Sequence, residues 1–237
     1  MSVIWHDLEC GAYDADLDLW RELAERYGSP VLDVGAGTGR VALELARRGH
    51  AVTALDRDPG LLEELERRGK GLPVQTAVAD AREFELGRRF PLIIVPMQTI
   101  QLLQGARGRG QFLRRAARHL ESAGALAIAI TETLEHYSPE DGLPLPLPDM
   151  QEIDGFVYSS QPTAVREQGE IIILERQRET VTPTGRRSTE HDEIRLDRLS
   201  VGELEREAKG AGLGWLGATE IPPTRDHVGS VVVMLCV

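Results

Sequence analysis

Three alternating glycines stand in the stretch VLDVGAGTGR, residues 31–40. Glycine adopts positive φ angles and lets a ligand approach the main chain, and a helix that follows such a loop presents free N–H groups. The stretch therefore predicts a site for a nucleotide-like ligand. Its spacing is G-x-G-x-G, with Arg40 where dinucleotide sites have the third glycine of G-x-G-x-x-G. Asp33 lies just ahead of the loop, where its charge would oppose a pyrophosphate and would suit a ligand that presents a cation.

Two further acids end short apolar runs, Asp56 in TALDRDPG and Asp80 in AVADAREF. Each acid has an ordinary alternative interpretation: Asp33 as a helix cap, Asp56 as a solvated strand-end residue and Asp80 as a turn residue. Their occurrence in order, at the ends of successive strand-like runs, favours a ligand site over three unrelated residues.

Strand-like and helix-like segments alternate from residue 30 to residue 131. Runs such as LIIV and ALAIAI are continuously apolar, which is typical of strands buried on both faces of a parallel sheet that helices cover. The amphipathic segments TGRVALELARRGH, DPGLLEELERRG and GQFLRRAARHLESAG predict the helices between the strands. We expect an α/β fold with a Rossmann-like, doubly wound, mostly parallel seven-stranded sheet and an antiparallel final strand.

The ends and the middle of the chain depart from this alternation. Apolar residues at helical intervals predict a helical region over 7–27, and the proline-rich SPEDGLPLPLPDM after Thr131 predicts a loop. Three extended segments follow, over 153–166, 170–182 and 187–196, and predict an inserted antiparallel β meander. A last helix with Ser200 as its N-cap and the strands GWLGATEI and GSVVVMLCV close the chain.

Composition narrows the class of protein. The chain has 237 residues, of which 41% are hydrophobic and 27% charged, and a formal net charge of −11, which disfavours nucleic acid or a membrane surface as the main partner. The basic run RGRGQFLRRAARH is interpreted as a solvated helix face. Two cysteines without metal-ligand spacing and a polar amino-terminal segment predict a cytoplasmic protein with no metal and no membrane span.

The landmarks described so far resemble those of class I S-adenosylmethionine-dependent methyltransferases of the small-molecule type. Residues 31–40 resemble that family's first motif, and FPLIIVPMQTIQLL resembles its fourth-strand motif. The resemblance covers about 7–131 and resumes over 200–237. It implies one methyltransferase domain with four parts: an N-terminal helical cap (1–28), the cofactor-binding core (29–131), the inserted loop and antiparallel strands (132–198), and the last helix with the closing strand pair (199–237).

The resemblance also implies a cofactor, S-adenosylmethionine, with S-adenosylhomocysteine as product. Asp56 would accept hydrogen bonds from the ribose hydroxyls, and Asp80 with the Ala81 N–H would bind adenine. Tyr13 would lie over the methionine part, with core packing as its alternative, and Arg40 would reach the methionine carboxylate or lie along its helix. The full set of cofactor residues is Tyr13, Asp33, Gly35, Ala36, Gly37, Thr38, Gly39, Arg40, Asp56, Arg57, Asp80, Ala81, Arg82, Pro96, Met97 and Gln98.

The fourth-strand motif contains VPMQT in place of Asn-Pro-Pro-Tyr or Asp-Pro-Pro-Tyr, the clamp of nucleic-acid amine methyltransferases. Together with the negative charge, this favours a small-molecule acceptor with a nitrogen or oxygen nucleophile. Candidate proton acceptors are His136, Glu132 and His227, with exposed loop side chains as the alternative. Candidate substrate ligands are Gln98, Gln101 and Tyr137.

Other functions remain open at this point. An NAD-dependent oxidoreductase is disfavoured by the glycine spacing and by the lack of a Tyr-x-x-x-Lys pair. A cofactor-binding partner subunit without turnover stays an alternative, because fold and cofactor do not establish chemistry. The alternating runs IIILERQRET and TEHDEIRL would bury one face, which predicts a lid or a homodimer contact for the inserted strands.

Overall fold

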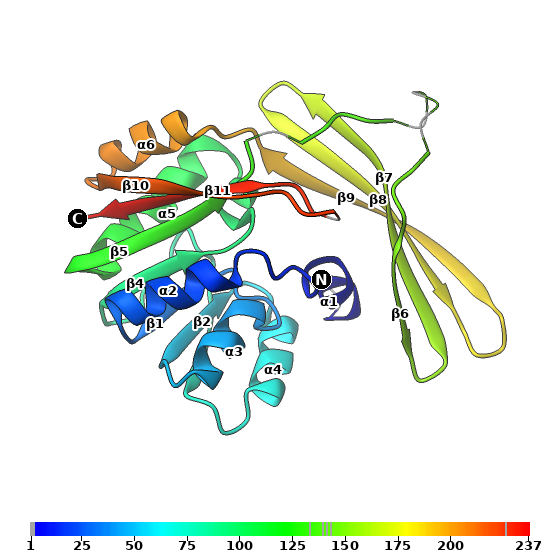
Figure 1. The fold of residues 1–237 in the computed structure, drawn as a ribbon, viewed down its shortest axis with the longest axis horizontal. Coiled ribbons are helices and arrows are strands. Elements are labelled where there is room, and N and C mark those ends of the chain that lie inside the picture. Colours follow the sequence, from blue (N-terminus) through cyan, green and yellow to red (C-terminus); the bar gives the residue numbers. More distant parts are fainter. Residues whose placement is uncertain (1–2, 133, 139, 141, 143, 226) are drawn as a thin grey trace. The chain divides into compact units, whose positions relative to one another are not determined.

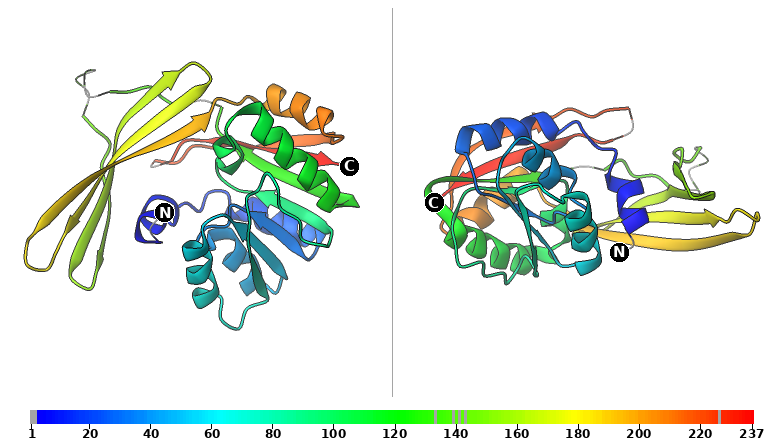
Figure 2. Two further views of the ribbon diagram at one scale, coloured as in Figure 1. Left: turned by 180° about the vertical axis from the view of Figure 1, so that it is seen from behind. Right: turned by 90° about the horizontal axis from the view of Figure 1, so that it is seen from below.

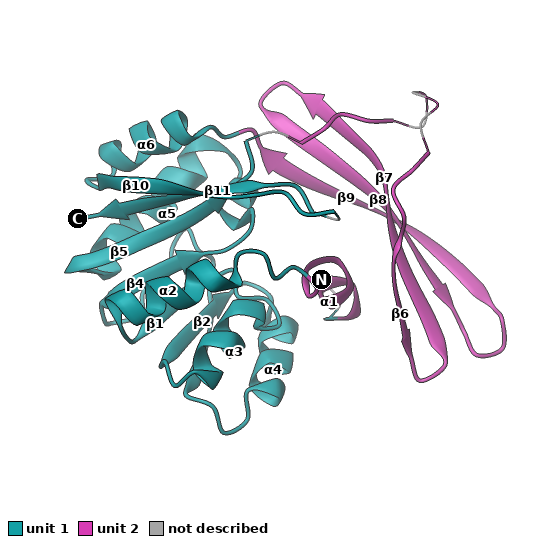
Figure 3. Cartoon of the chain, viewed as in Figure 1, with its two compact units in different colours: residues 1–3, 13–132, 199–237 teal, residues 4–12, 133–198 magenta. Residues whose placement is uncertain are grey.

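The computed structural model describes residues 3–132, 134–138, 140, 142, 144–225 and 227–237. The chain forms two compact units (Figure 3). Unit 1 contains residues 1–3, 13–132 and 199–237, and unit 2 contains residues 4–12 and 133–198. None of the helices in these described parts has an apolar stretch long enough to cross a bilayer.

Unit 1 is built on a seven-stranded sheet with the order β10-β11-β5-β4-β1-β2-β3 (Figure 1). Neighbours from β5 through β3 run parallel, whereas β11 is antiparallel to both β5 and β10. The predicted fold class is therefore confirmed, including the antiparallel final strand. The strands are β1 (Val31–Val34), β2 (Val52–Asp56), β3 (Val74–Val78), β4 (Phe90–Val95), β5 (Leu120–Ile130), β10 (Gly214–Ile221) and β11 (Ser230–Cys236).

Helices cover both faces of this sheet (Figure 2). Because side chains of a strand alternate between faces, Leu32 packs in one core with α5 and α6, and Val31 packs in the other core with α2, α3 and α4. Helices on both faces of the sheet are the doubly wound arrangement that the continuously apolar strands predict. The helices of unit 1 are α2 (Leu17–Tyr27), α3 (Arg40–Arg47), α4 (Pro59–Arg68), the short 3₁₀ helix η1 (Thr99–Leu102), α5 (Gly105–His119) and α6 (Val201–Gly210).

The amino-terminal region consists of two helices, where the sequence predicts one region. The first helix, α1 (Val3–Cys10), is followed by Gly11, whose N–H donates to the Asp7 carbonyl at 2.8 Å. A Cβ at Gly11 would lie 2.5 Å from that carbonyl oxygen, so only glycine fits this turn. Residues 4–12 belong to unit 2 and α2 to unit 1.

Unit 2 contains a four-stranded antiparallel sheet with the order β6-β7-β8-β9. The inserted meander is confirmed as β7 (Phe156–Gln168), β8 (Ile171–Val181) and β9 (Arg187–Asp197). The fourth strand, β6 (Asp149–Ile153), was not predicted, because four of its five residues are exposed and it lacks apolar alternation. Asp154 and Gly155 join β6 to β7 with φ angles of 51° and 77°, the two-residue hairpin turn for which Asp-Gly is a known signal.

Two predictions on the basic segment around α5 are wrong in part. The helix ends at His119 instead of continuing to 124, because β5 already pairs with β4 at Leu120. Arg109 is 6% exposed and donates from Nε and Nη2 to Glu207 at 2.9 and 2.7 Å, which joins α5 to α6. It is therefore a buried ion-pair residue and not part of a solvated face, whereas Arg107, Arg114 and Arg118 are exposed as expected.

Candidate functional site

The glycine loop lies between β1 and α3 and has the backbone that the sequence predicts. Gly35, Gly37 and Gly39 have φ angles of 75°, 55° and 96°, in the region that favours glycine. The N–H groups of Gly35 and Ala36 both donate to the Leu55 carbonyl, at 2.8 and 3.1 Å, so the loop is fastened to β2. At Gly35 a Cβ would lie 2.5 Å from Thr99 Cγ2, which leaves no room for a side chain.

Asp33 is the third residue of β1 and is 1% exposed. Neither carboxylate oxygen has a hydrogen-bond partner among the described residues. Burial raises the pKa of Asp33 to about 7, and the charge of Arg40 offsets this only in part. The Ala42 N–H is close enough to lower the pKa as well, but it does not meet the geometry of a hydrogen bond to either oxygen. A buried acid without a partner is costly, and such groups concentrate at functional sites. A cationic ligand group at this position would supply the missing partner.

Asp56, at the end of β2, fastens the glycine loop with its side chain. Its Oδ2 accepts from the Gly37 N–H and its Oδ1 from the Asp58 N–H, both at 2.9 Å. A carboxylate oxygen can accept two hydrogen bonds. Asp56 therefore has capacity left for the hydroxyl groups of a ligand while it shapes the loop.

Asp80 is bound by Arg82, which was predicted to contact the cofactor itself. Arg82 Nη2 lies 2.6 Å from Asp80 Oδ2, and the Arg82 N–H donates to Oδ1 at 2.8 Å. This pair holds the pKa of Asp80 below its usual value. Arg82 Nη1 also donates to Gln104 Oε1 at 2.9 Å. Ala81 is half-buried beside this pair, and Arg57 is exposed at the end of β2.

Arg40, the first residue of α3, forms a bidentate ion pair with Asp16. Nη1 lies 2.6 Å from Oδ1 and Nη2 lies 2.8 Å from Oδ2. Arg40 also donates to the Tyr13 carbonyl at 2.8 Å, and its guanidinium lies 5.1 Å from the centre of the Tyr13 ring. Asp16 in turn accepts from Trp20 Nε1 at 2.8 Å. Sequence reasoning missed Asp16, since nothing distinguishes it from the nearby Asp14 and Asp18.

Tyr13 is 7% exposed, and besides Arg40 it contacts two other residues. Its ring centre lies 4.9 Å from that of His227, and its phenol is hydrogen bonded to the Ser230 hydroxyl. Burial, followed by the charge of Asp16, raises the pKa of Tyr13. Of the three candidate proton acceptors, His227 is thus the one that the structure brings into contact with a predicted cofactor residue.

The other two candidate proton acceptors have different surroundings. Glu132 Oε1 accepts from the Val201 N–H at 2.8 Å, so this carboxylate caps the start of α6. His136 is exposed and belongs to unit 2. Tyr137, a predicted substrate ligand, also belongs to unit 2 and pairs through its backbone with Val165.

The segment after β4 carries Pro96, Met97 and Gln98. Met97 has a φ angle of 54°, unusual for a residue with a side chain. Gln98 Nε2 donates to Thr131 Oγ1 at 2.9 Å. Gln101 is 1% exposed, and its amide bonds both the N–H and the carbonyl of Thr131, at 2.9 and 3.0 Å. Both glutamines therefore tie the end of β5 to the segment after β4.

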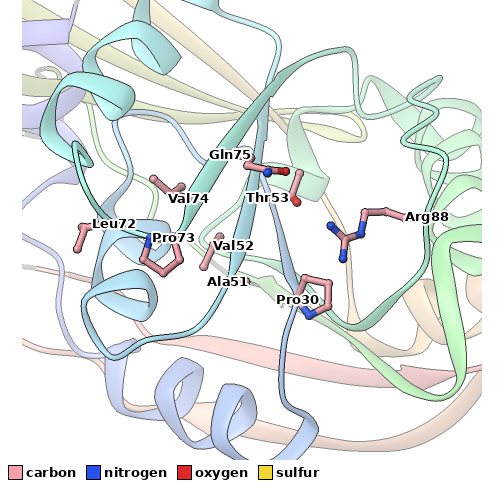
Figure 4. A pocket seen from close by; sticks show the side chains of 9 residues that line it. All are labelled: Pro30, Ala51, Val52, Thr53, Leu72, Pro73, Val74, Gln75 and Arg88. Atoms are coloured by element: carbon pink, nitrogen blue, oxygen red, sulfur yellow. The ribbon is translucent and has the colours of Figure 1, made fainter.

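A hollow of about 290 Å³ lies at the opposite, amino ends of the strands (Figure 4). None of the predicted site residues lines it. Ligands of open α/β sheets bind at the carboxyl ends of the strands, so this hollow is not the candidate site. Its lining residues are Pro30, Ala51, Val52, Thr53, Leu72, Pro73, Val74, Gln75 and Arg88.

Comparisons with known proteins agree with this geometry. A methyltransferase domain family matches residues 31–124. The cypemycin N-terminal methyltransferase of Streptomyces sp is 32% identical over 108 residues, which are 46% of this chain and 44% of that protein. The chain thus spans less than half the length of this curated relative.

Solved structures share the fold over almost the whole chain. A sugar N-methyltransferase from Streptoalloteichus sp has 21% identity and a TM-score of 0.75, over 98% of this chain and 90% of that one. An amino pentose methyltransferase from Micromonospora echinaspora, solved with S-adenosylmethionine bound, has 19% identity and a TM-score of 0.72, over 99% and 97%.

Residues 31–124 thus resemble a methyltransferase domain, and the chain has the fold of these solved methyltransferases. The matched segment begins with β1 and contains all three acids: Asp33 within β1, Asp56 at the end of β2, and Asp80 two residues after β3.

Proposed function

We propose that this chain transfers a methyl group from S-adenosylmethionine to a nitrogen or oxygen of a small-molecule acceptor and releases S-adenosylhomocysteine. The observation that carries the proposal is the buried Asp33 carboxylate, whose two oxygens have no partner among the described residues. The α-ammonium group of the cofactor is the cation that would pair with it. A pyrophosphate would instead be repelled, which argues against a nicotinamide cofactor.

The other proposed contacts to the cofactor are supported by the geometry of unit 1. Asp56 has acceptor capacity left for the ribose hydroxyls, and Asp80 with the Ala81 N–H suits the edge of adenine. The glycine loop brings main-chain N–H groups close to the ligand. Arg40 is already paired with Asp16, so its proposed part is to hold Tyr13 and Asp16 beside the site. Arg82 similarly orients Asp80.

S-adenosylmethionine supplies a methyl group activated by a sulfonium. The bond from sulfur to this carbon breaks as the lone pair of the acceptor forms the new bond on the opposite side, and the acceptor then loses a proton. Alignment of the reacting atoms supplies much of the rate in such a reaction, about 7–11 kcal/mol for well-oriented reactants. The chain's main task is accordingly to position both ligands and to exclude water.

His227 is the proposed proton acceptor. It lies against Tyr13, whereas the carboxylate of Glu132 caps α6 and His136 is an exposed residue of unit 2. A small-molecule acceptor is supported by the names of the relatives, which methylate sugars and the amino terminus of a peptide. Gln98, Gln101 and Tyr137 stay proposed substrate ligands, although both glutamines also bond Thr131.

The test is a transfer assay with S-adenosylmethionine labelled in its methyl group and a panel of amino sugars, amino-terminal peptides and matching hydroxyl compounds. We expect label in an organic product with release of an equal amount of S-adenosylhomocysteine. His227→Asn should lower turnover while it leaves the Kd for S-adenosylhomocysteine within about threefold. Tight cofactor binding without label transfer to any acceptor would favour the alternative of a partner subunit without turnover.

A cytoplasmic location and a homodimer through the inserted strands stay proposals. β6 is an edge strand and exposes 62% of Met150, which would suit contact with a second copy. Light scattering should give twice the chain mass of 26.1 kDa for the parent protein and a lower mass for Met150→Glu. If the parent protein has the mass of a single chain, the proposed dimer is contradicted.

A further inference from the structure

One face of the sheet in unit 2 is covered at one end by α1. Arg178 donates from Nε and Nη2 to the two Glu9 oxygens at 2.7 and 2.9 Å, and the Ser160 hydroxyl donates to Glu9 at 2.7 Å. The Trp5 ring lies 5.6 Å from the Tyr158 ring. These contacts cover the part of the face around the cross-strand pair of Ser160 and Arg178.

At the other end of the same face, residue 137 pairs with the edge of β7, and residues 134 and 137 pack against the face. Tyr137 and Val165 exchange two backbone hydrogen bonds, at 3.2 and 2.9 Å. This end is apolar, and its side chains form one cluster. The cluster contains Val165, Ile172 and Leu196, with Leu134, Tyr137, Leu174 and Ile194 packed against them.

Arg176 lies in the row between these two covered ends. The strand register pairs it with Pro162 on β7 and Asp192 on β9, one row from the pair of Ser160 and Arg178. Its Nη1 donates to Ser160 Oγ at 3.2 Å and lies 3.5 Å from Asp149 Oδ2, the longest reach of a hydrogen bond. The long contact with Asp149 therefore neutralises the charge of the Arg176 guanidinium only weakly.

Two buried donors in this region have no partner among the described residues: Arg176 Nε and the Tyr137 hydroxyl. The charge of Arg176 lowers the pKa of Tyr137, against the larger effect of burial, so the two groups lie within electrostatic reach of each other. Buried polar groups without partners are rare in folded proteins and call for a specific cause. Both groups offer a hydrogen, so their common complement is an oxygen that accepts.

We propose that Arg176 and Tyr137 form a recognition site for the carboxylate group of a small organic acid. A carboxylate oxygen can accept from Arg Nε–H and from a phenol, and charge-assisted hydrogen bonds of this kind are the strong ones. A doubly charged phosphate suits the site less, because Arg178 is already bound by Glu9 and Asp192 and only one guanidinium remains.

The test observes the guanidinium directly by NMR of protein labelled with ¹⁵N-arginine. The Arg176 Nε–H signal is assigned with Arg176→Lys, and sodium acetate is titrated at constant ionic strength against chloride. We expect a saturable shift of the Arg176 signal. Arg195, which is paired with Glu193, is the internal control and should not move. No saturable shift at Arg176, or an equal shift of both signals, would overturn the proposal.

Two variants sharpen this titration. Tyr137→Phe removes one donor and keeps the ring, so acetate affinity should fall about threefold or more, as for the loss of one hydrogen bond. Asp149→Asn removes the competing carboxylate, so acetate affinity should rise. Unchanged affinity in both variants would contradict the site. Both variants should bind S-adenosylhomocysteine like the parent, so a failed carboxylate site is distinguishable from a failed cofactor site.

Discussion

Arg40 and Asp16 form a bidentate ion pair in which the side chains are only 10% and 2% exposed. The pair joins the start of α3, directly after the glycine loop, to the residues that precede α2. Because Arg40 also donates to the Tyr13 carbonyl, one guanidinium holds both the tyrosine backbone and the buried acid. Removal of one member would leave the other charge buried without its partner.

Asp16→Asn should therefore lower the free energy of unfolding by about 3 kcal/mol, the range found when one member of a buried pair is removed. Urea denaturation monitored by tryptophan fluorescence measures this, since Trp20 shares the Asp16 carboxylate. Asp18→Asn is the matched control, because Asp18 is 95% exposed and its pair with Arg21 should contribute little. Equal stability of the two variants would show that the buried pair contributes nothing.

Asp33 should make stability depend on pH in a defined direction. Its pKa is raised from 3.8 to about 7 by burial, so the folded chain holds this proton more tightly than the unfolded chain does. Between about pH 4 and pH 7 its contribution to stability falls as the pH rises, and above pH 7 the full cost of the buried charge remains. Asp33→Asn removes that cost, so the Tm difference, variant minus parent, should grow from pH 4 to pH 7. A constant difference would contradict the raised pKa.

Binding of a cationic ligand should release the Asp33 proton. At pH 6 the carboxyl is largely protonated, and a bound ammonium favours its charged form, so affinity should rise with pH and level off above about pH 7. Calorimetry with S-adenosylhomocysteine in buffers of different ionisation enthalpy measures the released protons. We expect up to one proton at pH 6 for the parent and none from this site in Asp33→Asn. The same release from both proteins would assign the proton to another group.

The close contact of Gly35 with Thr99 predicts a second effect. Gly35→Ala should cost roughly 1–3 kcal/mol of stability, because positive φ and the contact at 2.5 Å both oppose a side chain, and it should weaken cofactor binding. Gly49→Ala is the control, since Gly49 has a φ angle of 91° but nothing within 4 Å of its added Cβ. Thermal melts and cofactor titration of both variants separate the two effects. Equal losses of stability in the two variants would mean that the positive φ angle alone opposes the side chain and that the contact with Thr99 contributes nothing.

The fold, and the positions of the three acids relative to its strands, could be predicted from the sequence because both depend on local pattern. Asp33 and Asp56 end or interrupt apolar runs, and apolar strands that alternate with amphipathic helices leave few topologies. The glycine loop could also be predicted, since its positive φ angles need glycine.

The partners of the arginines could not be predicted. Arg40 was expected to reach the cofactor or to lie along its helix, but its partner Asp16 lies 24 residues earlier. Arg109 was placed on a solvated face, while its partner Glu207 lies 98 residues later. Such pairs depend on which helices pack together, and the charge pattern of a single helix does not carry that information.

Calorimetric titration with S-adenosylhomocysteine at pH 8 tests whether Asp33 binds the cofactor. The parent, Asp33→Asn and Asp14→Asn are compared, and NADH is the second ligand. Asp14 is an exposed acid of the same region and serves as the control. We expect micromolar binding of S-adenosylhomocysteine to the parent and to Asp14→Asn, a loss of about tenfold or more in Asp33→Asn, and no binding of NADH. Equal affinity of Asp33→Asn and the parent, or binding of NADH instead, would contradict the assignment of Asp33 to the cofactor.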